Sequence, residues 1–190
     1  MATPYQRRFR WILGVVLAAG LGVGPGCGYS MVRYRDAIPG ARTLAIRPLE
    51  NGTFEPGVEA VVMDALRREA LARDGLRLID DTDAADLVLG GKVRSLNINA
   101  RSFTSVVLSV EYEVSLGLSL IAVRREGGKI PIDPRAQFER DRYLASADVE
   151  AMRKNRREAI HRLAEILASR VYDSLYESAA AGVGSPTATP

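Results

Sequence analysis

The sequence contains only one cysteine and one histidine, and this scarcity excludes several classes of function. A single cysteine cannot form a disulfide within the chain, so a packed core has to stabilise the fold. His161 has no evident partner for a nucleophilic triad and belongs to no set of residues with metal-ligand spacing. We therefore predict no catalytic residue, no metal site and no enzymatic activity, and we expect His161 to be a surface or boundary residue of a helix.

Long hydrophobic runs are also scarce, and the longest lies near the start of the chain. It covers residues 11–23, which is the length of a signal-peptide core and short for a membrane span. Residues 24–26 are small or turn-forming, and Cys27 follows them. This arrangement resembles a bacterial lipoprotein signal peptide, although Gly24 and Pro25 depart from its usual pattern. The alternative is an ordinary secretory signal in which the cysteine is incidental.

The lipoprotein interpretation makes residues 1–26 a signal peptide and Cys27 the lipid attachment site. Cys27 would carry covalent diacylglyceryl and N-acyl lipid such as palmitate, and no other cofactor is predicted. The leader holds no acidic residue, so the formal net charge of +3 resides in its arginines, which are Arg7, Arg8 and Arg10. The mature chain is neutral and lacks the basic footprint that nucleic-acid binding requires, so no nucleic-acid partner is predicted.

The mature chain divides into three parts by composition. Residues 27–42 are expected to form a lipidated linker, and residues 43–178 a single folded domain. Residues 179–190 carry no charge and consist mostly of small residues and proline, so we predict a disordered tail there.

The first half of the domain is predicted to be a strand, a helix and a second strand. A short strand covers residues 43–48, and a turn-rich loop covers residues 50–57. The helix is indicated by apolar residues with helical spacing, which are Val58, Val61, Val62, Ala65 and Leu66. We expect Gly75 to end this helix in a left-handed conformation. A second short strand follows over residues 76–79.

The second half is predicted to contain longer strands and a final helix. Residues 87–103 form a strand whose apolar residues change parity, which predicts a bulge or bend between residues 90 and 95. Apolar and polar residues alternate over residues 108–120, and a hairpin turn follows at residues 126–129. A further strand is expected between residues 129 and 144. The last helix begins near Ser146 or Asp148, with an apolar stripe of Ile160, Leu163, Ile166, Leu167, Val171 and Leu175.

This order of elements predicts an α+β fold. We expect a two-layer sandwich in which a four- to five-stranded, mostly antiparallel sheet carries two amphipathic helices on one face. The alternation over residues 108–120 indicates that the other face of the sheet is polar.

Two groups of acidic residues have a chemical and a structural interpretation. Asp80, Asp81, Asp83 and Asp86 lie close together, but they lack the spacing of a calcium loop, so a solvated turn is favoured. Glu111 and Glu113 lie on the same face of one strand, where paired carboxylates can perform acid–base chemistry. Exposed strand positions are often filled in this way, and we favour this second interpretation.

Basic residues supply a candidate binding surface. Lys92, Arg94 and Arg101 follow one predicted strand, and Arg124 lies at the end of its predicted neighbour, beside Arg125. If these strands pair, a basic patch forms at one end of the sheet, close to apolar residues. Such a patch suits an amphiphile with anionic head groups, since Arg and Lys pair with phosphate. The alternative is an ordinary solvated strand face.

Several segments in order resemble one known family. Gly26 to Tyr29 is followed by an Ile38-Pro39 step, the segment Thr43 to Asn51, the segment Thr53 to Glu59 and the segment Ala84 to Val93. Over residues 26–175 this order resembles the LptE family, the lipoproteins of outer-membrane lipopolysaccharide assembly.

The resemblance implies a non-enzymatic role in the Gram-negative envelope. An LptE-like protein is lipid-anchored on the periplasmic side of the outer membrane, plugs the barrel of its partner LptD, assists its assembly and contacts lipopolysaccharide. Gly28 is compatible with outer-membrane sorting because it is not the Asp that retains lipoproteins at the inner membrane. Lys92, Arg94, Arg101 and Arg124 then become candidate lipopolysaccharide-binding residues. The alternative is a periplasm-facing binding lipoprotein of another envelope secretion or efflux machine.

Overall fold

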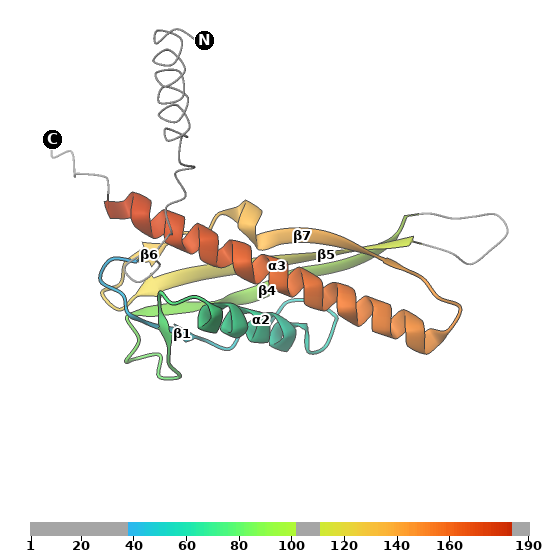
Figure 1. The fold of residues 1–190 in the computed structure, drawn as a ribbon, viewed down its shortest axis with the longest axis horizontal. Helices are drawn as coiled ribbons and strands as arrows, with labels where there is room; N and C mark the ends of the chain where they lie inside the picture. Colours follow the sequence, from blue (N-terminus) through green and yellow to red (C-terminus); the bar gives the residue numbers. More distant parts are fainter. Residues whose placement is uncertain (1–37, 102–110, 184–190) are drawn as a thin grey trace, which may run out of the picture. The chain divides into compact units, whose positions relative to one another are not determined.

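The computed structural model describes residues 38–101 and 111–183 (Figure 1). The predicted signal peptide, Cys27 and most of the linker lie outside these residues, as do residues 102–110 and 184–190. The elements are β1 (Thr43–Ile46), β2 (Glu50–Asn51), α2 (Val58–Ala72), β3 (Arg77–Leu78), β4 (Leu87–Ala100), β5 (Glu111–Arg124), β6 (Lys129–Ile130), the 3-10 helix η2 (Pro134–Gln137), β7 (Phe138–Leu144) and α3 (Val149–Val183).

The strands form one seven-stranded sheet, so the predicted α+β class is confirmed and the predicted strand count is too low. The order is β3-β1-β4-β5-β6, with β2 also paired to β4 and β7 also paired to β5. Prolines explain the higher count, because a residue without an N–H interrupts a strand ladder. Pro48 separates β1 from β2, and Pro134 begins the 3-10 turn that separates β6 from β7. The pairs that involve β1 and β2 are parallel, and the remaining pairs are antiparallel.

The predicted irregularity in the long strand is confirmed. The pairing of β4 with β5 shifts register between Val93 and Ser95, which is a bulge within the predicted interval. Leu87, Leu89 and Val93 are fully buried before the bulge. After it, residues of the other parity, Leu96 and Ile98, pack against the same core. The bulge thus keeps one apolar face along the whole strand.

Helix α2 is close to its prediction, but its end is different. Val58, Val62, Ala65 and Leu66 are buried as the stripe requires, and Val61 is partly buried. The helix ends at Ala72, because Arg73 already has an extended backbone. Gly75 is not among the glycines with positive φ in the described residues, so its predicted left-handed cap is wrong. The side chain of Arg73 provides another link at this end, since it donates hydrogen bonds to Glu69 and to Asp173 of α3.

Helix α3 buries a stripe with a repeat of four residues. The buried residues occur as neighbouring pairs along the helix, namely Ala159 with Ile160, Leu163 with Ala164, Leu167 with Ala168, Val171 with Tyr172 and Leu175 with Tyr176. A repeat of four exceeds the helical period of about 3.6, so the stripe winds around the helix and stays in contact with a twisted sheet. Ile166 lies between two pairs and is 41% exposed, so its predicted place in the core is wrong.

The ends of α3 are also informative. The Asp148 carboxylate accepts a hydrogen bond from the Glu150 backbone N–H, which confirms an expected cap at the start of the helix. At the other end the helix continues to Val183, and Ala179 is buried as the next residue of the stripe. The beginning of the predicted disordered tail is therefore helical, because its alanines have the highest helix propensity of all residues.

Both helices lie on the same side of the sheet in Figure 1, and their buried residues share one core with the inward residues of β4 and β5. The predicted two-layer arrangement is confirmed. No helix within the described ranges is both long and apolar enough for a membrane span. The sheet has two different faces. We call the one on which α2 and α3 pack the covered face, and the opposite one, on which none of the described helices lies, the bare face (Figure 1).

Candidate functional site

The bare face carries the polar half of the β4–β5 alternation. On β5 the residues that point away from the helices include Glu111, Glu113, Ser119 and Ile121, as the sequence pattern predicts. Glu113 forms ion pairs with Arg101 and with Arg140 of β7, at 3.3 and 3.9 Å. Glu111 and Arg142 are 3.7 Å apart. Each carboxylate is thus neutralised by arginines on neighbouring strands, as in an ordinary polar strand face.

The four candidate basic residues do not gather at one end of the sheet. Strands β4 and β5 pair as expected, but their antiparallel register sets Arg124 opposite Leu87, at the start of β4. Arg101 lies just beyond the other end of β4, where its N–H donates to Glu111. At about 3.3 Å per residue, these ends are roughly 40 Å apart. The prediction of one patch is therefore wrong, since the order of charges in the sequence does not give the strand register.

Lys92 and Arg94 occupy the middle of β4, Lys92 before the bulge and Arg94 within it, and both are exposed. Arg94 lies over Gly117 of β5, since a Cβ atom added to this glycine would be 3.7 Å from the Arg94 Nη2. The ring of Phe138 covers the same glycine, and the Arg140 guanidinium stands 5.3 Å from that ring. Arg94 thus lies next to the cation–aromatic pair of Arg140 and Phe138 in the middle of the bare face.

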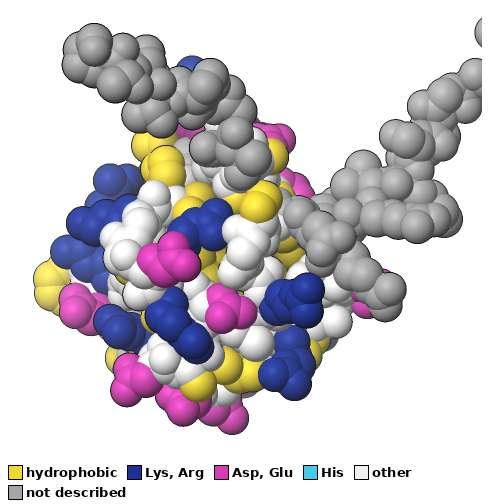
Figure 2. Space-filling view, turned by 90° about the vertical axis from the view of Figure 1, so that its left-hand side faces the viewer, with side chains coloured by type: hydrophobic (Ala, Val, Ile, Leu, Met, Phe, Trp, Pro, Cys, Tyr) yellow, Lys and Arg dark blue, Asp and Glu magenta, His cyan; other side chains and the backbone are white. Residues whose placement is uncertain are grey.

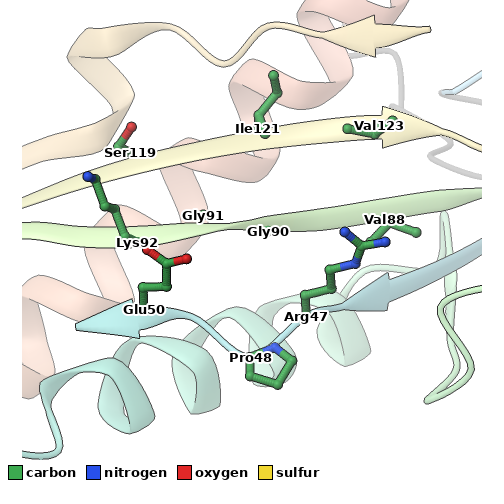
Figure 3. Close-up of a pocket in the computed structure, with 10 residues that line it drawn as sticks. All are labelled: Arg47, Pro48, Glu50, Val88, Gly90, Gly91, Lys92, Ser119, Ile121 and Val123. Atoms are coloured by element: carbon green, nitrogen blue, oxygen red, sulfur yellow. The ribbon is translucent and has the colours of Figure 1, made fainter. Parts of the chain in front are cut away.

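Lys92 lines an open hollow of about 420 Å³ on the bare face, which we call the sheet groove. Its walls come from β2, β4, β5 and the connection between β1 and β2 (Figure 3). The lining residues are Arg47, Pro48, Glu50, Val88, Gly90, Gly91, Lys92, Ser119, Ile121 and Val123. Parallel pairing of β1 with β4 brings Arg47 beside Gly90, and the Arg47 N–H donates to the Leu89 carbonyl at 2.9 Å.

Gly90 and Gly91 are neighbours in the sheet groove, but they have different roles. A Cβ atom on Gly90 would lie 3.5 Å from the Arg47 Cβ, which is ordinary contact, so this position tolerates a side chain that would fill the groove. Gly91 has a φ of 144°, and a Cβ there would lie 2.1 Å from the Ser119 carbonyl oxygen. Gly91 is therefore required by the fold, whereas Gly90 leaves space on the bare face.

The sheet groove combines an apolar floor with two cations and one carboxylate, that of Glu50, at its rim. Val88, Ile121 and Val123 supply the apolar surface. Figure 3 shows Arg47 and Lys92 on opposite sides of the Gly90–Gly91 backbone. Among the described residues neither cation makes an ion pair or a side-chain hydrogen bond. Two unpaired cations about an apolar floor suit the phosphate and the adjoining apolar part of an amphiphile.

Arg124 and Arg125 serve the local fold at the end of the sheet where β4 begins. Arg124 donates to the Pro39 carbonyl at 2.8 Å, and Arg125 donates to the carbonyl oxygens of Ala84 and Ala85. They line a second hollow of about 370 Å³ next to the sheet groove. Figure 2 looks onto this end and shows Lys and Arg mixed with Asp and Glu, so the surface does not have a single sign of charge.

The acidic turn before β4 is structural. The Asp86 carboxylate accepts hydrogen bonds from the backbone N–H groups of Arg42 and Thr43 and from the Thr43 hydroxyl, at 2.8 to 3.0 Å. These bonds, the Arg42 N–H first, lower the pKa of Asp86 below its ordinary value. The Asp81 carboxylate accepts from the N–H groups of Asp83 and Ala84. Within the described part of the chain no group of three His, Cys, Asp or Glu residues is arranged to hold a metal.

His161 is exposed on α3, as expected. The lipid attachment site proposed at Cys27 lies outside the described residues. Sequence reasoning missed Arg47 and Glu50 as groove residues. The signal available was an arginine directly before a proline at a strand end, but only the β1–β4 pairing makes it a neighbour of Lys92.

A family model described as "LptE: Lipopolysaccharide-assembly" matches residues 41–175, which is most of the chain. The chain belongs to the LptE family. The match begins just before β1 and ends within α3. It therefore contains the whole sheet and every residue that lines the sheet groove. None of the curated sequences compared with this LptE-family chain is significantly similar to it.

Solved lipoprotein structures resemble the chain at low sequence identity. A minor lipoprotein from Acinetobacter baumannii is 16% identical, with 70% of this chain and 94% of that chain covered and a TM-score of 0.44. Rare lipoprotein B from Shewanella oneidensis is 12% identical, with 73% and 98% covered and a TM-score of 0.44. Lipoprotein B from Nitrosomonas europaea is 12% identical, with 83% and 94% covered and a TM-score of 0.44.

Proposed function

We propose that this LptE-family chain is a non-enzymatic lipoprotein of the outer membrane, anchored through lipid on Cys27 and exposed on the periplasmic side. There it plugs an LptD-like barrel, assists the assembly of that barrel and takes part in lipopolysaccharide transport to the cell surface. The family match over residues 41–175 carries this proposal. The hydrophobic leader that ends at Cys27 supports the anchor, because acyl chains hold a protein at a membrane without a spanning helix.

The bare face has properties that support residence in a polar barrel lumen. Its charged residues occur largely as ion pairs between strands, as in the pairs that Glu113 makes with Arg101 and Arg140. Such a surface is hydrophilic without a strong net charge, so it can lie against a water-filled, mixed-charge wall. The covered face is fully used by α2 and α3 and is not available for a partner.

Co-purification tests the barrel partner. The full-length chain with a C-terminal tag should be recovered from detergent-solubilised outer membranes together with a large β-barrel in equal amount. A Cys27→Ala variant should lose the membrane anchor, and mass spectrometry of the wild-type N-terminus should find an acylated Cys27. Recovery of the anchored protein without a barrel would contradict the plug function. It would favour a binding lipoprotein of another envelope machine.

We further propose the sheet groove as the lipopolysaccharide contact. The phosphate groups of lipopolysaccharide would pair with Arg47 and Lys92, and its apolar part would cover Val88 and Ile121. This choice moves the proposed contact away from Arg101 and Arg124, whose side chains are engaged with Glu113 and Pro39. Lys92 is the member of the predicted basic set that lines the sheet groove, and Arg94 lies beside it.

Two double variants with the same loss of charge test the groove. Arg47→Gln with Lys92→Gln should weaken lipopolysaccharide binding by about tenfold or more, since each charge-assisted hydrogen bond contributes on the order of 1.5–3 kcal/mol. Arg101→Gln with Arg124→Gln should change the affinity by less than about twofold. Binding is measured with purified protein and labelled lipopolysaccharide at two salt concentrations. Equal losses from both variants would indicate nonspecific attraction and would contradict the groove assignment.

A further inference from the structure

The loop between β2 and α2 displays the most exposed large hydrophobic side chain of the described residues. Phe54 has a relative exposure of 106%, so its ring is at least as accessible as in an extended reference peptide. The other large hydrophobic residues that are exposed range from 38% to 71%. Single exposed apolar residues are common and need no explanation by themselves. The surroundings of Phe54 distinguish it from such cases.

The loop that carries Phe54 is held in place by its own polar side chains. Asn51 uses both ends of its amide, since its Nδ2 donates to the Glu55 carbonyl and to Glu59 Oε2, at 2.8 and 2.7 Å. Its Oδ1 accepts from the N–H and the hydroxyl of Thr53, both at 2.8 Å. The Thr53 hydroxyl in turn accepts from the Glu55 N–H at 3.1 Å. The residues on both sides of Phe54 are thus fixed to one another.

The same loop is fastened to both layers of the domain. On the sheet side, the Gly52 N–H donates to the Val93 carbonyl at 2.9 Å, and a Cβ at Gly52 would lie only 2.8 Å from that oxygen. On the helix side, the Glu55 carboxylate pairs with Arg156 of α3. A loop tied in this way to β4 and α3 holds the Phe54 backbone in one position.

This combination favours binding to a partner. An aromatic side chain that is buried on association contributes about 1.5–3 kcal/mol through the hydrophobic effect. A loop that is already ordered loses little further entropy when it binds, so most of that gain remains as affinity. Aromatic residues, Phe among them, are enriched in the buried cores of protein interfaces. By contrast, folding gains nothing from a Phe54 ring that stays in water.

Charge identifies the kind of partner. Glu50 and Glu59 lie within a few residues of Phe54, and neither makes an ion pair among the described residues, whereas Arg156 neutralises Glu55. An acidic surround opposes insertion into an anionic membrane surface, which attracts basic segments. An aromatic ring surrounded by carboxylates is complementary to a protein pocket that has an apolar floor and basic or hydrogen-bond-donor groups at its rim.

We propose that residues 51–56 form a docking loop, whose Phe54 inserts into an apolar pocket with a basic rim on a protein partner. Residues 51–56 do not line the sheet groove, although Glu50 just before them does, and the proposal does not require the partner to be the barrel. It assigns a role to the Thr53–Glu59 segment, which the lipid anchor and the groove leave without one.

Photo-crosslinking in cells tests which molecule contacts Phe54. Phe54→p-benzoyl-phenylalanine in the full-length chain should give an adduct with one identified protein. The matched control is Leu71→p-benzoyl-phenylalanine. Leu71 is also exposed, at 71%, but it lies in the last turn of α2 and outside the loop that carries Phe54. It should not give that adduct. An adduct at position 54 with lipid alone, with a second copy of this chain or with nothing would overturn the proposal.

Affinity measurements with the identified, purified protein complete the test. Phe54→Ala should weaken binding at least about tenfold, and Leu71→Ala should change it less than about twofold. Asn51→Ala keeps the ring but releases the loop, so it should weaken binding several-fold. Unchanged urea midpoints for Phe54→Ala would show that folding is intact. Unchanged affinity of Phe54→Ala would overturn the docking loop, whereas failure of barrel co-purification by the wild-type chain would overturn only the plug function.

Discussion

On the side of the sheet that α2 and α3 cover, the inward residues of β5 from Val114 to Ala122 are at most 6% exposed. On the bare side of the same strand, Ile121 is 38% exposed and lies in the open sheet groove. The covered face is filled to the density of a protein interior, so side-chain volume decides which residues fit there. On the bare face, charge and the missing side chain at Gly90 determine what the surface can bind. A single alternating strand therefore supplies both the core and the candidate site.

This difference makes the covered face the place where substitutions cost most stability. Leu167 is fully buried in the α3 stripe, and its neighbour Ile166 is 41% exposed. Leu167→Ala should lower the free energy of unfolding by about 2–5 kcal/mol, because it removes buried area and leaves a cavity. Ile166→Ala should lower it by less than about 0.5 kcal/mol. Urea unfolding followed by circular dichroism measures both values. Similar losses for the two variants would contradict the four-residue stripe and, with it, the contrast between the two faces.

Neighbouring glycines in the sheet groove provide the next largest effect and test whether the bare face is free of packing constraints. Gly91→Ala should lower the free energy of unfolding by about 1–3 kcal/mol, because its Cβ would clash with the Ser119 carbonyl and its φ disfavours a side chain. Gly90→Ala meets only ordinary contact with Arg47, so it should leave stability nearly unchanged. Urea midpoints of the two variants give the comparison.

The same glycine pair also separates folding from binding. Gly90→Val narrows the groove while keeping the backbone and both cations, so it should weaken lipopolysaccharide binding without a matching loss of stability. If Gly90→Val leaves lipopolysaccharide binding unchanged, the hollow itself has no role in recognition, and the charges of Arg47 and Lys92 have to be tested alone.

Local pattern was enough to predict the covered face. The alternation of β5, the parity change of β4 and the stripe of α2 each depend on residues close in sequence, and each places its apolar residues correctly. Ile166 fails because a period of 3.6 residues does not describe a stripe that winds with the sheet. The error is small, since the neighbouring Leu167 still places α3 on the core.

The candidate site was less predictable, because it depends on pairings between distant segments. Strand β1 lies between β3 and β4, so the chain passes through α2 and β3 before β4 arrives beside β1. Only that parallel pairing makes Arg47 a neighbour of Lys92. Arg124 was assigned to a patch with Arg101 because both are basic and lie on adjacent strands, and the register then separated them. Charge composition indicated basic residues along β4 and β5 but not their positions relative to one another.

The smallest expected effect concerns Asp86, which lies just before β4 and next to the start of β1. Both faces of the sheet end there. Hydrogen bonds from Arg42 and Thr43 stabilise the Asp86 carboxylate, and they lower its pKa in the folded state. A lowered folded pKa means that this stabilisation is fully present above the unfolded value of about 3.9 and is lost as the pH falls through the folded value. Asp86→Asn should therefore lower stability by about 1 kcal/mol at pH 7.

The difference between wild type and Asp86→Asn should shrink as the pH falls below about 4, since protonation removes the same charge from the wild-type side chain. Urea midpoints at pH 7 and pH 3 measure it. Asp83→Asn is the matched control, because its carboxylate accepts no hydrogen bond within the described residues. A constant difference at both pH values would mean that Asp86 acts through the shape of its side chain. The edge would then depend on packing, like the covered face, and charge would matter only in the sheet groove and the ion pairs of the bare face.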